Sequence, residues 1–198
     1  MRTFPFLLLF ALVPVLARAA APADYEVRNG TLDRGDDGVP FEWKAYPPGN
    51  GQSTKIESGE NGGTTISDAD SVAGVGVGQG IQIQGGYKYR AAMETEGDGG
   101  LLFSLSFLPR LPAKIGQMNK LKIGELKAWA TAGEPAVIEG VAPAEANYAW
   151  VWVYSPTKTE QDARVLVKSV KVEELGAAPT EQVPAAATPT PKKSQATE

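Results

Sequence analysis

The stretch Tyr148-Ala149-Trp150-Val151-Trp152-Val153-Tyr154 decides the fold class of this chain, because aromatic and small aliphatic side chains alternate along its whole length. In a β-strand successive side chains point to opposite faces of the sheet. The alternation therefore predicts a strand with a row of aromatic rings on one face and Ala149, Val151 and Val153 on the other. The aliphatic row is suited to the core of an antiparallel sheet that buries one face.

Two interpretations of the aromatic row remain open at this stage. If the row lies on an outer or concave surface, its flat rings with polar rims form a stacking site for amphipathic ligands such as sugar rings. If the row is buried, Trp150 and Trp152 are simply core residues. Sequence alone does not separate these two interpretations.

The rest of the chain predicts more short strands of the same kind, separated by clusters of Gly, Pro, Asn and Asp. This pattern is typical of an all-β protein, an antiparallel sandwich or barrel. The predicted strands are Tyr25–Asp33, Phe41–Tyr46, Thr64–Ser67, Val72–Gln84, Tyr87–Thr95, Leu101–Leu108, Lys120–Ala130, Ala136–Val141, Asn147–Tyr154 and Ala163–Glu174.

Alternation also assigns faces within these strands. Tyr89, Ala91 and Met93 are predicted on a core face, and Phe103, Leu105 and Phe107 likewise. Arg90 and Glu94 then lie on the solvent face, where they could bind ligand hydroxyl groups or remain ordinary strand surface. In the last strand, Val165, Val167 and Ser169 are predicted to share one face.

Both ends of the chain differ from its middle. The uncharged stretch Phe4–Ala17 follows Arg2 and precedes small residues, which is typical of a secretory signal peptide, assigned here to residues 1–21. It is too short to span a bilayer, so no membrane insertion is predicted and the protein is expected to be secreted or periplasmic. Residues 24–175 form the predicted domain, and residues 176–198 are a Pro/Ala/Thr-rich tail expected to be disordered.

Composition excludes several functions. The chain contains neither histidine nor cysteine, which removes the commonest catalytic base, the commonest zinc ligand and any disulfide. No local set of residues indicates a nucleophile with its base, so we expect no enzymatic activity. A net charge of −4 argues against a nucleic-acid partner.

The glycine-rich stretch Gly74-Val75-Gly76-Val77-Gly78-Gln79-Gly80 is not a phosphate-binding loop, since it lacks the following Gly-Lys-Ser/Thr and a helix signal. Within a strand, Val75 and Val77 would face the core. Gly76 and Gly78 would then leave the other face bare, so that a ligand or another chain segment can approach closely.

Three parts of the chain resemble a known family, the carbohydrate-binding modules of bacterial cellulases and xylanases, which have the galactose-binding-like jelly-roll fold. The first is Asn29–Asp33 with Gly38–Trp43, the second is Ile81–Tyr89, and the third is the closing pair Gly140–Tyr154 and Val165–Val172. The resemblance implies a jelly-roll β-sandwich that binds polysaccharide or oligosaccharide, with Trp43 in the core. It also implies a structural calcium site that includes Asp33. Because Val167–Val170 contains Lys168 and no acid, we predict no cofactor.

The leading hypothesis is therefore a secreted, non-catalytic carbohydrate-binding module. Trp150 and Trp152 would stack on the rings of a polysaccharide. Tyr148, Tyr154, Arg90 and Glu94 would bind ring edges and hydroxyl groups. The alternative is a structural or adaptor β-sandwich of the envelope or of an extracellular complex, which binds a protein partner and no sugar.

Overall fold

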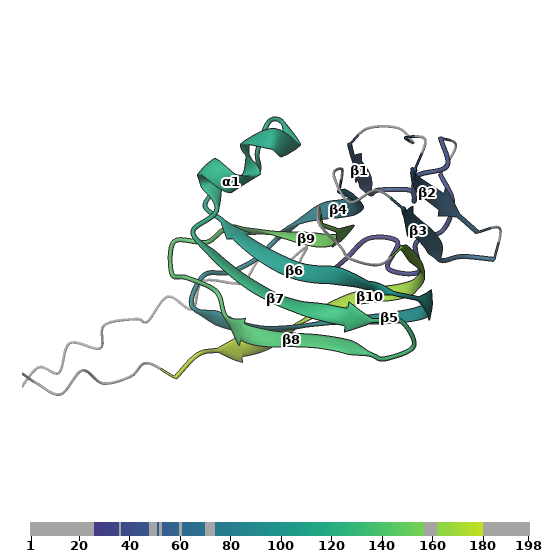
Figure 1. Cartoon of the computed structure of the whole chain (residues 1–198). Coiled ribbons are helices and arrows are strands. Elements are labelled where there is room, and N and C mark those ends of the chain that lie inside the picture. Colours follow the sequence, from purple (N-terminus) through teal and green to yellow (C-terminus); the bar gives the residue numbers. More distant parts are fainter. Residues whose placement is uncertain are drawn as a thin grey trace, which may run out of the picture.

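A computed structural model describes residues 26–35, 37–47, 51, 53–59, 61–69, 74–156 and 162–179. The predicted signal peptide, and the predicted tail beyond residue 179, lie outside the described residues. Within these ranges the protein consists of two antiparallel five-stranded sheets that pack face to face (Figure 1). The all-β sandwich predicted from the sequence is confirmed.

The first sheet has the order β1-β4-β9-β6-β7 and contains the aromatic strand β9. Its strands are β1 (Lys44–Tyr46), β4 (Val75–Gln82), β9 (Tyr148–Ser155), β6 (Gly100–Leu108) and β7 (Gly124–Thr131). The second sheet has the order β2-β3-β10-β5-β8. Its strands are β2 (Thr54–Ser58), β3 (Thr64–Asp68), β10 (Ala163–Ala177), β5 (Tyr87–Asp98) and β8 (Ala136–Val141). From β4 to β10 the chain passes repeatedly between the two sheets, as in a jelly roll.

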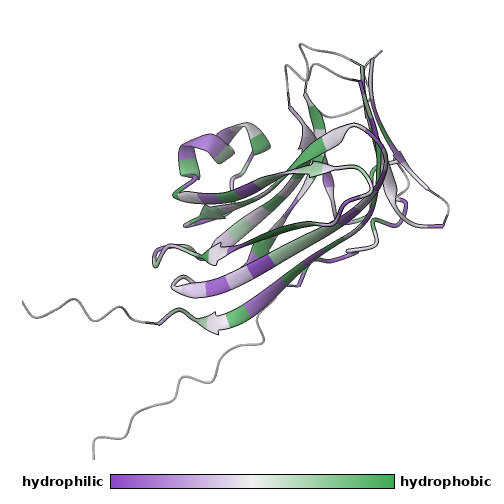
Figure 2. Cartoon of the chain, turned by 60° about the horizontal axis from the view of Figure 1, so that its bottom comes forward, coloured by the Kyte–Doolittle hydropathy of each residue, from purple (hydrophilic) through white to green (hydrophobic). Residues whose placement is uncertain are grey.

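The core lies between the inner faces of the two sheets and follows the predicted alternation. Hydrophobic and hydrophilic residues alternate along the strands (Figure 2). Val75, Val77, Tyr89, Phe103 and Val151 are among the fully buried side chains. Burial of such apolar side chains is the main favourable term in folding. Trp43 is buried in the same core, and its Nε1 donates a hydrogen bond to the backbone oxygen of Asn29 at 3.1 Å.

The predicted strand Tyr25–Asp33 is wrong, because its described residues form turns. Asn29 explains the difference. Its side-chain Oδ1 accepts a hydrogen bond from the backbone N–H of Asp33 at 2.8 Å, and its φ of 50° is incompatible with an extended strand. Such local side-chain hydrogen bonds compete with sheet formation.

Other strands differ from the prediction as well. Strand β2 was missed, and the predicted strand Lys120–Ala130 begins only at Gly124, after a short helix α1 (Met118–Leu121). In β10 a register shift between Val167 and Ser169 changes the phase of the alternation. Val170 therefore enters the core in place of Ser169, which is only partly buried.

Candidate functional site

The aromatic row of β9 faces away from the main core. Ala149, Val151 and Val153 are fully buried between the sheets, as the alternation predicts. Trp150 and Trp152 instead form a second, smaller cluster with Leu108 on the outer face of the first sheet. Strand β9 therefore contributes to two separate apolar layers, one on each of its faces.

A chain segment folds over this outer cluster. It comprises the 3₁₀ turn η1 (Ile115–Gln117) and helix α1, between β6 and β7, and we call it the covering segment. Ile115, Met118 and Leu121 of this segment pack against this cluster. Trp150 is only 4% exposed and Trp152 only 8%. The tryptophan rings thus face away from the main core, as one interpretation requires, but they are largely covered and so not free to stack on a ligand over their whole faces.

The glycines of β4 provide the space that the tryptophan rings occupy. Gly78 pairs with Trp152 in the register of β4 and β9. A Cβ atom at Gly78 would lie 2.0 Å from Cε3 of Trp152 and 2.2 Å from Nε1 of Trp150. The bare face of β4 predicted from the sequence is therefore filled by rings from the neighbouring strand.

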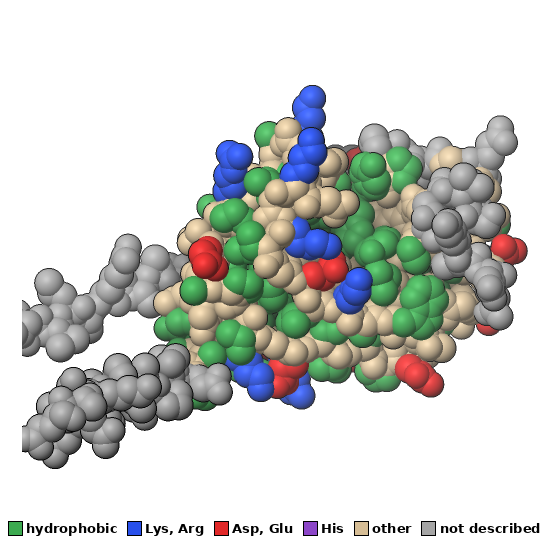
Figure 3. Space-filling model, turned by 60° about the vertical axis from the view of Figure 1, so that its left-hand side comes forward, with side chains coloured by type: hydrophobic (Ala, Val, Ile, Leu, Met, Phe, Trp, Pro, Cys, Tyr) green, Lys and Arg blue, Asp and Glu red, His purple; other side chains and the backbone are tan. Residues whose placement is uncertain are grey.

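An open groove lies between the covering segment and the aromatic face of the first sheet. It has a volume of about 510 Å³, and Tyr46, Trp152, Tyr154, Met118 and Asn119 are among its lining residues. Hydrophobic side chains gather on this face beside the projecting basic residues (Figure 3). Tyr46 is 46% exposed, so the groove offers at least one accessible ring.

The rings of this groove are tilted with respect to one another. The ring centroids of Trp152 and Tyr154 are 5.7 Å apart at an interplanar angle of 48°. Tyr46 and Trp152 are 6.3 Å apart at 52°. A flat ligand ring can therefore stack on one of these rings while its edge meets the next, but it cannot lie parallel to two neighbours at once.

Polar groups lie along one side of the aromatic row. Glu125 of β7 accepts hydrogen bonds at Oε1 from Ser106 Oγ at 3.2 Å and from Lys122 Nζ at 3.0 Å, and its Oε2 lies 3.5 Å from Lys127 Nζ. Burial acts to raise the pKa of Glu125, but the hydrogen bonds and charges of Lys122, Ser106 and Lys127 together hold this pKa below its ordinary value. The carboxylate is therefore charged at neutral pH.

The phenol of Tyr154 stays protonated at neutral pH. Burial, and to a smaller extent the charge of Glu125, raise the pKa of Tyr154 above its ordinary value of 10.0. Its hydroxyl group can therefore donate a hydrogen bond as well as accept one. This combination of apolar ring and polar rim is suited to a sugar.

Not all of the predicted site residues lie together. Tyr148, Trp150, Trp152 and Tyr154 share the outer face of the first sheet. Arg90 and Glu94 belong to β5 in the second sheet, so the structure corrects their assignment to the aromatic site. Arg90 instead pairs with Glu139 of the adjacent strand β8, with a distance of 3.3 Å between Nε and Oε2.

Sequence reasoning missed two aromatic residues of the same face. Tyr46 is in contact with Trp152 although about a hundred positions separate them. Trp129 of β7 pairs with Leu102, which itself pairs with Tyr154, and it is 50% exposed. Only the pairing of strands brings these residues to one face. The alternation Lys44-Ala45-Tyr46 was the sole local signal for Tyr46.

The predicted metal ligand Asp33 lies among the turns that precede β1. Asp33 is exposed, and among the described residues no group of three or more Asp or Glu side chains could hold a metal ion. The nearby part of β10 offers the backbone of Val170, whose N–H donates to Gly30. Calcium takes six to eight oxygen ligands, and the absence of a cofactor stays a prediction from the sequence.

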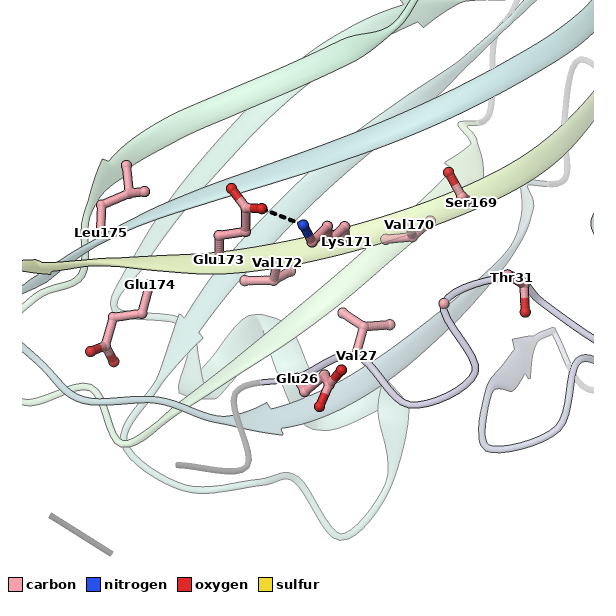
Figure 4. Close-up of a pocket in the computed structure, with 11 residues that line it drawn as sticks. Glu26, Val27, Thr31, Ser169, Val170, Lys171, Val172, Glu173, Glu174 and Leu175 are labelled. Carbon is pink, nitrogen blue, oxygen red and sulfur yellow. Dashed lines mark hydrogen bonds and ion pairs between the residues drawn. The ribbon is translucent and has the colours of Figure 1, made fainter. Parts of the chain in front are cut away.

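A second hollow lies beside β10 in the other sheet (Figure 4). It has a volume of about 760 Å³ and is lined by the loop from Glu26 to Thr31 and by β10 from Ser169 to Leu175. Its lining includes three glutamates and an ion pair between Lys171 and Glu173, but no aromatic ring. It lacks the stacking surface that the sequence motifs predict.

Among known proteins, only solved structures were found to be similar to this chain. Neither a protein-family model nor a curated protein sequence matches the chain. Among solved structures, the enzymatically active domain of tailspike protein 4 of bacteriophage CBA120 matches with a TM-score of 0.57 at 12% identity, covering 77% of this chain and 22% of that one. This match supports the β-sandwich fold.

Carbohydrate-binding modules are also among the matching structures. A CBM4 module matches at a TM-score of 0.49 and 15% identity, over 74% of this chain and 97% of that one. The CBM22-1–GH10 modules of a Clostridium thermocellum xylanase, solved with xylohexaose, match at 0.43 and 18%, over 76% and 28%. This chain thus spans about a quarter of the first structures it matches. The fold of the chain is a β-sandwich.

No helix in the part of the chain that the structure describes is long and apolar enough to cross a membrane. The signal peptide, and with it secretion, stays a prediction from the sequence.

Proposed function

We propose that this protein is a secreted, non-catalytic carbohydrate-binding module, and that its ligand site is the groove between the aromatic face of the first sheet and the covering segment. The observation that carries the proposal is the cluster of Tyr46, Trp152 and Tyr154 around an open volume of about 510 Å³. Aromatic rings with adjacent polar groups are the surface that a sugar ring requires, because its CH groups stack while its hydroxyl groups hydrogen-bond.

The residues of the groove have different roles in the proposed binding. Tyr46 and Tyr154 offer the more accessible rings, while Trp152 forms the wall between them. Asn119 of the covering segment can accept or donate hydrogen bonds, and the protonated Tyr154 hydroxyl can donate one. Trp150 lies beneath the covering segment and supports Trp152 at a ring distance of 6.3 Å.

The test is affinity electrophoresis through native gels that contain soluble polysaccharides. Retardation that is lost in Tyr46→Ala and Tyr154→Ala, with unchanged circular dichroism, supports the groove as the site. Phe41→Ala is the matched control, since Phe41 is a 62% exposed ring outside the groove lining. If no polysaccharide on a broad panel retards the protein, the proposed function is wrong.

The alternative, a structural or adaptor sandwich, is favoured by one observation, namely that the covering segment leaves little of Trp150 and Trp152 exposed. Iodide quenching of fluorescence in a Trp129→Phe background separates the two, because Trp129 is the most exposed tryptophan among the four. A sugar that protects the remaining signal or shifts its emission supports the binding module. A purified extracellular protein that shifts it when no sugar does supports the adaptor.

A further inference from the structure

The charge around the groove is opposite in sign to the charge of the whole chain. The chain has 23 acidic and 19 basic residues. Between positions 109 and 127, which include the covering segment, there is one acid, Glu125. The five basic residues of this stretch are Arg110, Lys114, Lys120, Lys122 and Lys127. All five are exposed, and blue side chains project from this region in Figure 3.

The sheet register adds basic groups on both sides of the central tryptophan. Lys44 pairs with Gly78, Gly78 with Trp152, Trp152 with Ser104, and Ser104 with Lys127. Paired residues of an antiparallel sheet share a face, so this row places Lys44 and Lys127 on the groove side of the sheet. The backbone of Lys44 and that of Lys127 each lie two strands away from Trp152, which is a distance of about 10 Å.

These basic groups outnumber the acidic groups that they can pair with. On the second sheet Lys88, Lys168 and Lys171 each form an ion pair with a glutamate. Lys44, Lys114 and Lys120 form no ion pair with any described residue, and Lys122 and Lys127 share the single carboxylate of Glu125. An excess of positive over negative charge around an apolar groove attracts anionic ligands and raises their rate of association.

From these observations we infer that the ligand of the groove is an acidic polysaccharide, whose sugar rings carry carboxylate or sulfate groups. The inference rests on the proposed function and names its ligand class. The sugar ring would stack on Tyr46 or Tyr154, while the anionic substituents reach Lys44 on one side and Lys127 on the other. Charge-assisted hydrogen bonds of this kind are about twice as strong as neutral ones.

The experiment compares matched pairs of polysaccharides that share a backbone and differ in charge. Three such pairs are polygalacturonate and its methyl ester, glucuronoxylan and the same xylan without glucuronate, and dextran sulfate and dextran. We expect the acidic member of at least one pair to bind about tenfold more tightly at about 0.01 M salt. This preference should largely disappear at about 1 M salt, where the Debye length falls from about 30 Å to about 3 Å. The first two pairs test carboxylates and the third tests sulfates.

Variants then locate the effect. Lys44→Gln and Lys127→Gln should each weaken binding of the acidic member severalfold and leave binding of the neutral member unchanged. Lys55→Gln is the control with the same change of charge, because Lys55 is exposed on β2 of the other sheet.

The outcomes separate the inference from the proposed function. Equal binding of acidic and neutral members that still depends on Tyr46 overturns the inference and leaves the proposed function standing. Binding of no polysaccharide overturns both. A single-stranded oligonucleotide that binds as tightly as the best acidic polysaccharide, with the same dependence on Lys44, also overturns the inference.

Discussion

Gly78 of β4 lies directly opposite Trp152 of β9, and the indole ring of Trp152 occupies the space that a side chain at Gly78 would need. A Cβ atom there would lie 2.0 Å from the ring, where nothing in a tightly paired sheet can easily move. The outer aromatic layer therefore packs directly on the backbone of the neighbouring strand β4.

Substitution of Gly78 by alanine should therefore destabilise the protein. We expect a loss of about 1–3 kcal/mol in the free energy of unfolding, the usual cost of overpacking. Gly116→Ala is the matched control, because a Cβ at Gly116 has no atom within 4 Å and its φ is not positive. Urea unfolding measures both. Equal stability of the two variants would mean that the tryptophan rings do not fill the space above Gly78.

Truncation of one buried ring, Trp150, and of one exposed ring, Tyr46, should separate the effect on stability from the effect on binding. Trp150→Ala removes a ring that is 4% exposed and should cost about 3–5 kcal/mol. Tyr46→Ala removes a ring that is 46% exposed, so its effect on stability should stay within about 0.5 kcal/mol while sugar binding is lost. A Trp150→Ala variant as stable as the unmodified protein would contradict the covered position of Trp150.

Acid should weaken the contacts beside the groove through Glu125. The folded-state pKa of Glu125 lies below the ordinary value of 4.5, so its stabilisation is complete above about that pH and is lost as the pH falls through the folded pKa. Because the group is partly exposed, the effect should not exceed about 1 kcal/mol. We therefore expect the unmodified protein to be more stable than Glu125→Gln at neutral pH. The free energies of unfolding of the two proteins should converge as the pH falls. A difference in the free energy of unfolding that stays constant with pH would refute a contribution from the Glu125 carboxylate.

Removal of divalent metal should leave stability unchanged. Asp33 is the only predicted metal ligand, and among the described residues no group of three or more Asp or Glu side chains could hold a metal ion. A bound ion would stabilise the folded state by mass action, so chelation would lower Tm. Thermal unfolding with and without EDTA provides the measurement. A fall of several degrees that calcium reverses would establish a site that this geometry does not reveal.

The end of the folded domain lies beyond the predicted boundary at Leu175. Gly176 and Ala177 pair with Lys88 and Tyr87, and the N–H of Ala178 donates to Gly86 at 2.9 Å. Truncation after Leu175 should therefore cost about 1 kcal/mol or more relative to truncation after Pro179, since each hydrogen bond contributes about that amount. Identical urea midpoints for the two truncated proteins would restore the shorter boundary.

The sequence by itself determined the sandwich, because alternation along a strand is a local property. Ala149, Val151 and Val153 had to face one layer and Trp150 and Trp152 the other, whichever strands became their neighbours. Turns were harder to predict from the sequence. At Asn29 a side-chain hydrogen bond stabilises a turn where a strand was predicted.

Only the tertiary structure decided what covers the outer face. Ile115 and Met118 pack against the outer cluster that contains Trp150 and Trp152. Tyr46 reaches Trp152 from a distant strand, and Arg90 is placed in the other sheet. Each of these depends on the pairing and connection of strands far apart in sequence. Periodicity fixes which face a side chain takes, but the exposure of that face is fixed by the segments that pack on it.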